Sequence, residues 1–539
     1  ISATVDPANT PSIFGPGTVL YRNRANFPAR TDLPTSQQQS LIPNPGNGVN
    51  AFDPNLKPGY VQSWTFGIQR ELTKDTVLEV RYVGNHGTKL WRQIELNQVN
   101  ISNNGFLDEF KRAQQNQAIC SANSQACLNA QAAAGIAATS RSSLAYGNFG
   151  LLGQQPVPII QTAIGGANSG VDTTFITSVQ RGEAARAAQN IALNTSRMNN
   201  LINAGLVPFV TQANGTKVSN YFIVNPTVGN GGAFLVTNGT STNYNGLQVE
   251  LRRRLSKGLL VQGSYAFSKS LSNMYNSSNS VFSEPVDLRD PGRSHGISPW
   301  DITHAFKINW LYEIPTGRNH WLGFKGDGFA SKFGNTVVGD WQFNGVARIQ
   351  SGTPFLVIGG RETATANDLQ SVSSDNGVVL HGLTRRQLQD LVQIRHIGNQ
   401  VYFLPKDLVD NSLAAFEAGG RNLAQLDPNA PYIGPVTTPG EFGERIVLYG
   451  PRFTRFDLSL LKRFRIKESK EFQFRVTMLN AFNNINFLAT SPGNDSSTFS
   501  LGSTTPIFGT TTFAYRDSTV SGTNDPGGRL VEFQLRLNF

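Results

Sequence analysis

The stretch Arg529-Leu-Val-Glu-Phe-Gln-Leu-Arg-Leu-Asn-Phe539 decides the fold class of this chain. Side chains alternate between the two faces of an extended strand, so apolar and polar residues separate completely here. The apolar face carries Val531, Phe533, Leu535, Leu537 and Phe539. In an outer-membrane barrel, one face of each strand meets lipid and the other meets the lumen. We therefore predict a barrel strand that takes part in barrel assembly. The last strand of a soluble β-sandwich is the alternative at this point.

The same alternation recurs along the chain and predicts about nine membrane crossings. The other predicted strands lie at about 60–70, 76–97, 247–252, 259–268, 303–312, 340–352, 452–464 and 471–478. A strand needs roughly 9–11 residues to cross a bilayer, whereas strands of soluble proteins are usually about 5–6 residues long. The lengths favour a transmembrane antiparallel β-barrel, and the fold class is all-β.

The connections between these strands differ in length according to the side on which they lie. Short turns are expected at 71–75, 256–258 and 465–470. Long connections are expected at 98–242, 271–300, 353–451 and 485–528. Because outer-membrane barrels have short periplasmic turns and long extracellular loops, we expect the long set to be extracellular. The connection 315–339 is an exception, since it is long for the periplasmic side.

The polar faces of the predicted strands are rich in charge. Their cations are Arg81, Arg252, Arg254, Lys307, Arg348, Arg455, Arg475 and Arg536. The acids on the same faces are Glu79, Glu250, Asp457 and Glu471. This density of charge suits a wet lumen or contact with a plug, so we predict that these cations face the lumen.

Composition excludes several classes of protein. The 539 residues are only 15% charged and include 53 glycines, a balance typical of a β-rich protein with long polar loops. No apolar run reaches the roughly eighteen residues of a transmembrane helix. The net charge is +10, but its cations are scattered, so we expect no nucleic-acid partner. The chain begins at Ile1 without Met, which suggests a fragment.

The long connections contain a cysteine pair and two helical patterns. Cys120 and Cys127 are predicted to form a disulfide, with two free thiols as the alternative, since two ligands make no ordinary zinc site. Helices are expected at 183–204, ending before Gly205, and after a capping box at Thr384. We find no pattern for catalysis, metal binding or a cofactor, and expect no enzyme activity.

Several motifs, in order along the chain, resemble the Oar-like TonB-dependent receptors. One of them is Trp300-Asp-Ile-Thr-His-Ala-Phe306. The others lie at 53–72, 80–89, 244–255, 263–270, 339–341, 350–355, 450–460 and 474–483. The resemblance implies a barrel of about 22 strands with an N-terminal plug, of which about 13 strands would precede this chain. It also implies contact with a TonB-type energy-coupling protein through the missing N-terminal part.

We therefore expect residues 1–59 to be an extracellular lead-in and 60–539 to be part of a TonB-dependent receptor barrel in the bacterial outer membrane. The expected partners are outer-membrane lipid, the barrel-assembly machinery, the energy-coupling protein and an unknown bulky solute. The main alternative is a structural or adhesive surface barrel without uptake activity. A secreted all-β enzyme is a third class, but no catalytic cluster supports it.

Overall fold

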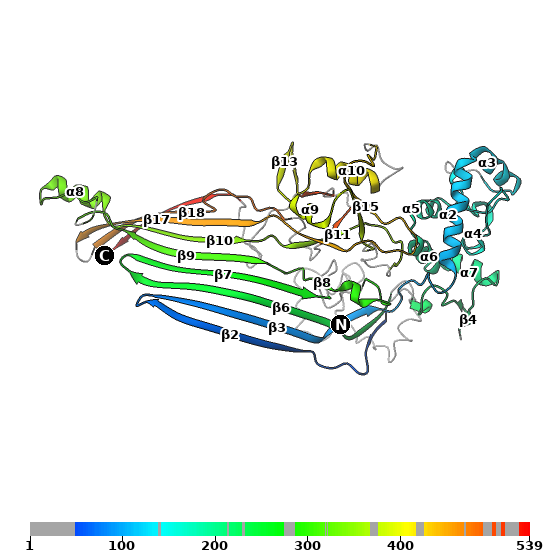
Figure 1. Cartoon of the computed structure of the whole chain (residues 1–539), viewed down its shortest axis with the longest axis horizontal. Coiled ribbons are helices and arrows are strands. Elements are labelled where there is room, and N and C mark those ends of the chain that lie inside the picture. Colours follow the sequence, from blue (N-terminus) through cyan, green and yellow to red (C-terminus); the bar gives the residue numbers. More distant parts are fainter. Residues whose placement is uncertain are drawn as a thin grey trace, which may run out of the picture.

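One long antiparallel sheet dominates the computed structural model of this chain (Figure 1). The described residues are 49–137, 142–212, 215–228, 232–273, 286–318, 320, 322–366, 376–416, 425–467, 470–488, 498–502, 508–511 and 528–539. The first 48 residues of the expected lead-in, and the part of the 485–528 connection at 512–527, therefore lie outside the described residues.

The predicted crossings are all strands of this sheet, and each pairs with the next in sequence order. The strands are β2 (Tyr60–Thr73), β3 (Thr76–Glu95), β6 (Ala233–Ser256), β7 (Leu259–Ser272), β9 (His304–Ile314), β10 (Trp341–Gln350), β17 (Phe453–Lys467), β18 (Lys470–Leu479) and β21 (Leu530–Asn538). Two short strands join its side: β1 (Val49–Phe52) pairs with β6 in parallel, and β8 (Gly296–Ile297) pairs with β7.

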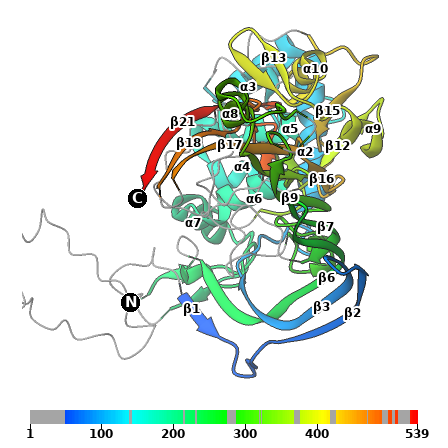
Figure 2. The ribbon, with the colours of Figure 1, turned by 90° about the vertical axis from the view of Figure 1, so that its left-hand side faces the viewer.

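The sheet is curved and open (Figure 2). Its edge strands are β2 and β21, which do not pair with one another in the described part of the chain. Strands β3 and β6 extend beyond the others at one end, where residues 88–95 of β3 run beside 233–240 of β6. The long connection predicted at 98–242 is thus shorter than expected, because the residues after Ala233 satisfy their backbone groups in the ladder with β3.

Short and long connections lie at opposite ends of the sheet (Figure 1). Two residues link β2 to β3, two link β6 to β7, and two link β17 to β18. The link from β9 to β10 lies at this same tight-turn end and contains helix α8 (Phe329–Val338). The remaining links lie at the other end, and most of their described residues fold into two packed bodies.

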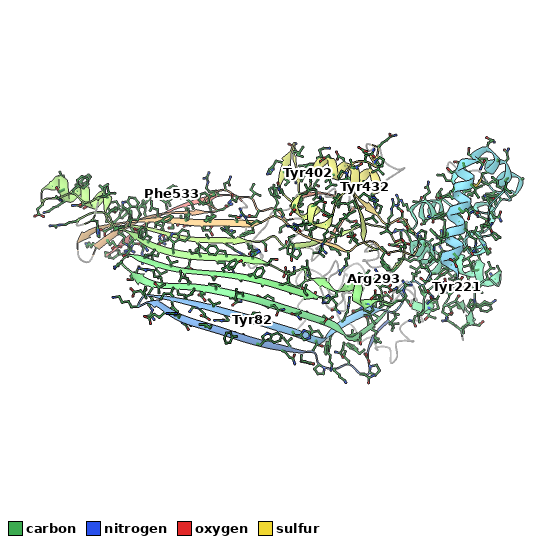
Figure 3. All side chains as sticks on the ribbon, viewed as in Figure 1. Tyr82, Tyr221, Arg293, Tyr402, Tyr432 and Phe533 are labelled. Carbon is green, nitrogen blue, oxygen red and sulfur yellow. A yellow bond between two sulfur atoms is a disulfide. The ribbon has the colours of Figure 1, made fainter. Side chains whose placement is uncertain are left out.

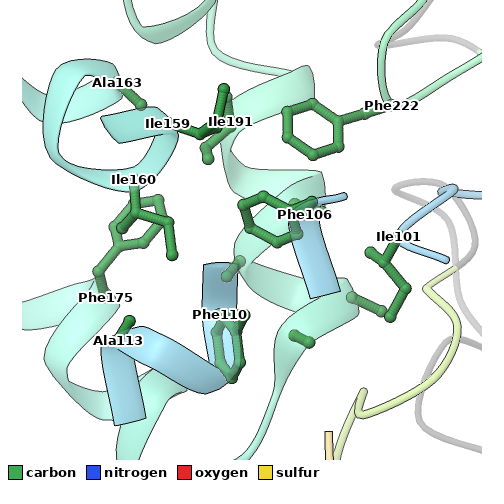
Figure 4. Close-up of a cluster of buried hydrophobic side chains, with 14 of the residues drawn as sticks. Ile101, Phe106, Phe110, Ala113, Ile159, Ile160, Ala163, Phe175, Ile191 and Phe222 are labelled. Carbon is green, nitrogen blue, oxygen red and sulfur yellow. The ribbon is translucent and has the colours of Figure 1, made fainter. Parts of the chain in front are cut away.

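The first body, here called the helical cap, comprises the described residues between 98 and 228. Its main helices are α2 (Phe106–Ala122), α3 (Ser124–Ala133), α4 (Pro158–Ile164), α5 (Thr173–Arg181), α6 (Ala184–Ala192) and α7 (Thr195–Asn203). Short 3-10 turns lie at Ser142–Leu144, Gly166–Asn168 and Pro226–Val228, and a two-stranded ladder joins β4 (Val210–Thr211) to β5 (Lys217–Val218). Its core is fully buried, with the rings of Phe106 and Phe222 in edge contact at 4.9 Å (Figure 4).

The second body, here called the mixed cap, comprises the described residues between 353 and 450 together with 498–511. It contains α9 (Arg385–Asp390), α10 (Lys406–Phe416), β11 (Pro354–Ile358), β12 (Val378–His381), β13 (Arg395–Ile397), β14 (Gln400–Tyr402), β15 (Tyr432–Pro435) and β16 (Ile446–Tyr449), with β19 (Thr498–Ser500) and β20 (Thr510–Thr511). Strand β19 pairs with β11 and β20 with β14, so the connection before β21 contributes to this body.

The expected helices need one correction. The single helix predicted at 183–204 is two helices, α6 and α7. The chain breaks at Asn194, whose side chain accepts a hydrogen bond from the Arg197 amide at 3.0 Å and caps α7. Gly205 follows the helix end with φ +70°, as predicted, and the capping box at Thr384 and Gln387 is present.

Candidate functional site

Strand register gives the sheet one polar and one apolar face. Residues directly opposite each other on paired strands point to the same face. Arg348 lies opposite both Lys307 and Arg455. The same rule, followed from strand to strand, places on one polar face the predicted residues Arg81, Arg252, Lys307, Arg348, Arg455, Arg475 and Arg536 with Glu79, Glu250, Asp457 and Glu471. Arg254 follows Arg252 by two positions in β6.

Charges on the polar face pair along their own strands. Arg252 Nη2 donates to Glu250 Oε2 at 2.8 Å, and Gln262 from β7 donates to the same carboxylate at 2.9 Å. Arg455 Nε donates to Asp457 Oδ1 at 3.0 Å. These pairs join residues two apart, which share a face in a strand. The face is therefore a solvated charge ladder rather than a concentrated cationic patch.

A hollow of about 410 Å³ lies over the sheet where β7, β9, β10, β17 and β18 run side by side. Its polar-face lining comprises Leu260, Asn309, Leu311, Asn344, Val346, Asp457, Ser459 and Thr477. Four neutral hydrogen-bonding side chains, one carboxylate and three aliphatic side chains make up this lining. The hollow therefore combines polar and apolar groups.

The opposite face is apolar on every long strand. It includes Val80, Tyr82, Val249, Tyr265, Phe306, Ile308, Trp310, Phe343, Phe456, Leu460, Phe474 and Val476. Phe533 of β21, labelled in Figure 3, belongs to this face, and its ring stacks on that of Phe474 with centroids 6.4 Å apart. Glycine makes room for the largest rings, since a Cβ on Gly345 would lie 2.1 Å from the Trp310 ring.

A buried carboxylate joins the mixed cap to the sheet. Asp301, which is 1% exposed, accepts the Ser270 amide proton at 2.5 Å and the Tyr449 hydroxyl proton at 2.6 Å. Lys269 Nζ lies 3.7 Å from the same carboxylate. Burial, reinforced by the bond to Asp301, raises the pKa of Tyr449. The end of β7 is thereby fixed to β16.

A second polar cluster joins the two caps. Amides of Ala185 and Arg186, at the start of α6, donate to the backbone oxygen of Glu362 at 3.2 and 3.3 Å. The Arg186 guanidinium lies 3.3 Å from the Glu362 carboxylate, which is nearly buried. Burial raises the pKa of Glu183 and lowers that of Arg361 to about 10. Ala366 also belongs to the core of the helical cap, so the caps form one continuous body.

Glu109 is a buried carboxyl group inside the helical cap. It is 3% exposed and accepts the Ile160 amide proton at 2.8 Å. Burial raises its pKa to about 7. An unfolded glutamate titrates near about 4.3, so the folded cap holds a proton that the unfolded cap releases.

The free energy of unfolding of the helical cap is therefore expected to fall as the pH rises from about 4.5 to 7. Outside that window Glu109 should contribute little to the pH dependence. The pKa of Glu109 is higher in the folded cap than in the unfolded cap. Its stabilising contribution is therefore complete at low pH and is lost as the pH rises. The loss is about 3 kcal/mol. Hydrogen exchange of cap amides at about pH 5 and pH 8, corrected for intrinsic rates, measures it. Glu109→Gln should abolish most of the difference, and an unchanged difference would contradict the assignment.

The structure joins Cys120 at the end of α2 to Cys127 in α3 by a disulfide. Both sulfurs are fully buried, and the side-chain amide of Gln131 donates to Cys127 Sγ at 3.1 Å. The bond holds two helices of the cap at a fixed angle.

Alkylation under denaturing conditions should add no label before reduction and label both Cys120 and Cys127 after it, as measured by intact mass. Cys120→Ala/Cys127→Ala should weaken the cap by about 2–3 kcal/mol, because the unfolded cap loses a short cross-link. Labelling without reduction would show free thiols instead.

The fold and these faces define a class: a curved antiparallel sheet of long strands with one apolar and one charged face has the features of a membrane-spanning β-barrel. The family model described as outer membrane beta barrel domain matches residues 1–151 and 168–526, and the chain belongs to this family. Its place is therefore the bacterial outer membrane, as predicted. Within the described residues, no helix is long and apolar enough to span a bilayer, and no three His, Cys, Asp or Glu side chains gather as metal ligands.

Two solved structures show what the chain is similar to. The outer membrane transporter YddB from Escherichia coli shares 7% identity at a TM-score of 0.30, over 91% of this chain and 34% of the transporter. The ferripyoverdine receptor of Pseudomonas aeruginosa shares 10% identity at a TM-score of 0.26, over 82% of this chain and 25% of the receptor. This chain thus spans a quarter to a third of their length. No curated protein matches it.

Sequence reasoning did not predict the burial of Glu109, Asp301 and Glu362, since a buried acid is recognisable only when its neighbours are known. It also missed helices α2 to α5. A signal for α2 was present, because Phe106, Phe110 and Ala113 recur at helical spacing and all are buried.

Proposed function

We propose that this chain is the C-terminal barrel part of an Oar-like TonB-dependent receptor that moves a bulky solute across the outer membrane. The observation that carries the proposal is the concentration of apolar residues on one face of the nine long strands and of most charged residues on the other. The polar face lines the lumen, and the predicted cations point into it. The ordered family motifs support the receptor assignment, and the outer-membrane family supports the barrel.

The two caps mark the extracellular end in this proposal. Outer-membrane barrels keep short turns in the periplasm and long loops outside, so the long connections predicted at 98–242 and 353–451 face the medium. Residues 60–539 then form part of the barrel, with the lead-in at 1–59 outside. A barrel of about 22 strands would need about 13 more strands than this chain supplies. An N-terminal plug, separate from those strands, would contact the energy-coupling protein.

Solute depletion tests the transport proposal. Native cells with and without the gene are grown in medium rich in peptides and oligosaccharides, and the supernatants are compared by mass spectrometry, with and without a protonophore. At least one solute should be depleted only by energised cells that carry the gene. Identical supernatants would overturn the uptake function.

A structural or adhesive barrel is the second candidate, and the joined caps favour it. A single body bonded through Glu362, Asp301 and Tyr449 presents a fixed surface to the medium. Identical supernatants together with loss of cell-to-cell or surface adhesion on gene deletion would establish this candidate in place of the receptor.

The apolar residues of β21 are proposed to guide barrel assembly, through contact with the assembly machinery and lipid. Phe539 is 92% exposed on the same face as Phe533 and Leu537. Phe539→Ala should lower the folded barrel in outer-membrane fractions, about tenfold if burial of the ring is worth 1.5 kcal/mol. Asn538→Ala, on the polar face of the same strand, is the control. Equal membrane yields for wild type and Phe539→Ala would contradict this role.

A further inference from the structure

Helix α8 and the segment before it form an amphipathic element at the tight-turn end of the sheet (Figure 1). This connection is long for the side on which short turns are expected. Its apolar side chains are exposed: Leu322 48%, Phe324 51%, Phe329 86%, Phe333 63% and Val337 45%. None of the helix residues is buried. A water-soluble surface would seldom gather so many large apolar groups in one short segment.

The element presents its apolar side outward because its polar side is used internally. Asn335 donates to the Phe324 oxygen at 2.9 Å and accepts the Phe324 amide proton at 2.8 Å. Ser331 donates to the Lys325 oxygen at 2.9 Å. Phe329, Phe333 and Val337 follow at helical spacing on another side, and the first two rings stack at 6.2 Å.

The helix is continuous with the apolar face of the sheet. Trp341, which begins β10 on that face, donates its ring N–H to the Val337 oxygen at 3.0 Å. Lys462, which is 1% exposed and lies over the Trp341 and Phe464 rings, donates its ammonium group to the Gly339 oxygen just beyond the helix. Tryptophan is enriched at the boundary between the hydrocarbon layer and water.

We propose that residues 322–338 lie in the headgroup region of the membrane as an interfacial helix and bind a phospholipid surface. The apolar side chains enter the boundary of the acyl chains, while Lys325 and Lys332, both exposed, attract anionic headgroups. The proposal rests on the assignment of the apolar sheet face to lipid made above. It gives the long connection a role in fixing the depth of the barrel in the bilayer.

Depth-dependent fluorescence quenching tests it on the full chain. Single variants Phe329→Cys and Phe333→Cys are labelled with an environment-sensitive dye, with the native disulfide oxidised, and reconstituted into phosphatidylethanolamine and phosphatidylglycerol vesicles. Lipids carrying a spin label near the headgroup should quench both dyes at least about threefold more than the same label near the chain end. Leu152→Cys is the control, an apolar residue 99% exposed in the helical cap, and should not be quenched.

A label at Phe533→Cys, on the apolar sheet face, distinguishes failure of the helix proposal from failure of the assignment of the sheet face to lipid. If it is quenched and the labels at Phe329 and Phe333 are not, the helix does not bind lipid and this inference is overturned alone. If none is quenched, the assignment of the sheet face fails as well. Quenching that disappears on dilution of protein in lipid would indicate a second copy as the occupant and also overturn the inference.

A double variant checks the apolar side chains directly. Phe329→Ser/Phe333→Ser carries the dye at Val337→Cys, and its quenching by the shallow spin label should fall at least about threefold relative to Val337→Cys alone. These rings make no buried contact, so folding of the sheet should be unaffected. Equal quenching would overturn the role of the two rings.

Discussion

Ile308→Arg is expected to block stable folding of the chain in the membrane, whereas Asn309→Arg, one residue further on, should be tolerated. Ile308 lies on the apolar face opposite Ala347 and Gly263. Asn309 lies on the polar face opposite Val346 and Gln262. An arginine near the bilayer midplane costs about 2–4 kcal/mol on a lipid-facing position. In a water-filled lumen the same side chain remains hydrated and costs little.

The pair is matched because both changes place the same side chain in the middle of β9. Full-length protein carrying each change is expressed in native cells, and the folded fraction in outer-membrane extracts is measured by resistance to heat and protease. The folded fraction for Ile308→Arg should fall by about thirtyfold or more if the cost is 2 kcal/mol. An equal loss of folded protein in both variants would show that neither face lines a wet lumen. A larger loss for Asn309→Arg than for Ile308→Arg would show that the polar face meets lipid instead.

Gly182→Ala is expected to separate the two caps. Gly182 has φ +72°, and a Cβ there would lie 1.9 Å from the backbone oxygen of Thr437 in the mixed cap. A backbone atom cannot move aside as a flexible side chain would, so the caps must shift and the amides of Ala185 and Arg186 lose the Glu362 oxygen. Leaving such buried groups unpaired costs about 1–3 kcal/mol each.

Gly205→Ala is the control, because φ is +70° there and no atom lies within 4 Å of the added Cβ. It carries the same backbone strain of about 1 kcal/mol without the collision. Hydrogen exchange at Ala185 and Arg186 should accelerate at least about tenfold in Gly182→Ala and remain near the wild-type rate in Gly205→Ala. Equal exchange rates in the two variants would show that the caps are not held together at this contact.

The transmembrane part of this chain was largely predictable from sequence. In a strand that meets lipid on one side and water on the other, the polarity of a residue indicates the face on which it lies. The alternation with a period of two can therefore be recognised from a single strand. Leu458 and Leu460 alternate with Asp457 and Ser459 for this reason, whereas Leu461 and Lys462 depart from the pattern. The short turns at 71–75, 256–258 and 465–470 then ordered the strands, because strands joined by so few residues pair with each other.

The caps were not predictable to the same degree. Their helices are short and their cores combine residues far apart in sequence, such as Phe106 with Phe222 and Ala366 with the helical cap. Burial of Glu109, Asp301 and Glu362 depends on those long-range contacts, and nothing in the local sequence distinguishes these acids from exposed ones. The same holds for α8, whose pattern is amphipathic but whose outward apolar side follows from the hydrogen bonds of Asn335.

The sequence by itself determined the strands, their order, their two faces and the outer-membrane assignment, since lipid imposes a local, periodic requirement on every crossing. Only the tertiary structure decided how the long connections pack and which acids are buried. It also decided that Phe324, Phe329 and Phe333, in the connection at 315–339, are exposed. Those features arise from contacts between distant segments, and a linear pattern carries no record of them.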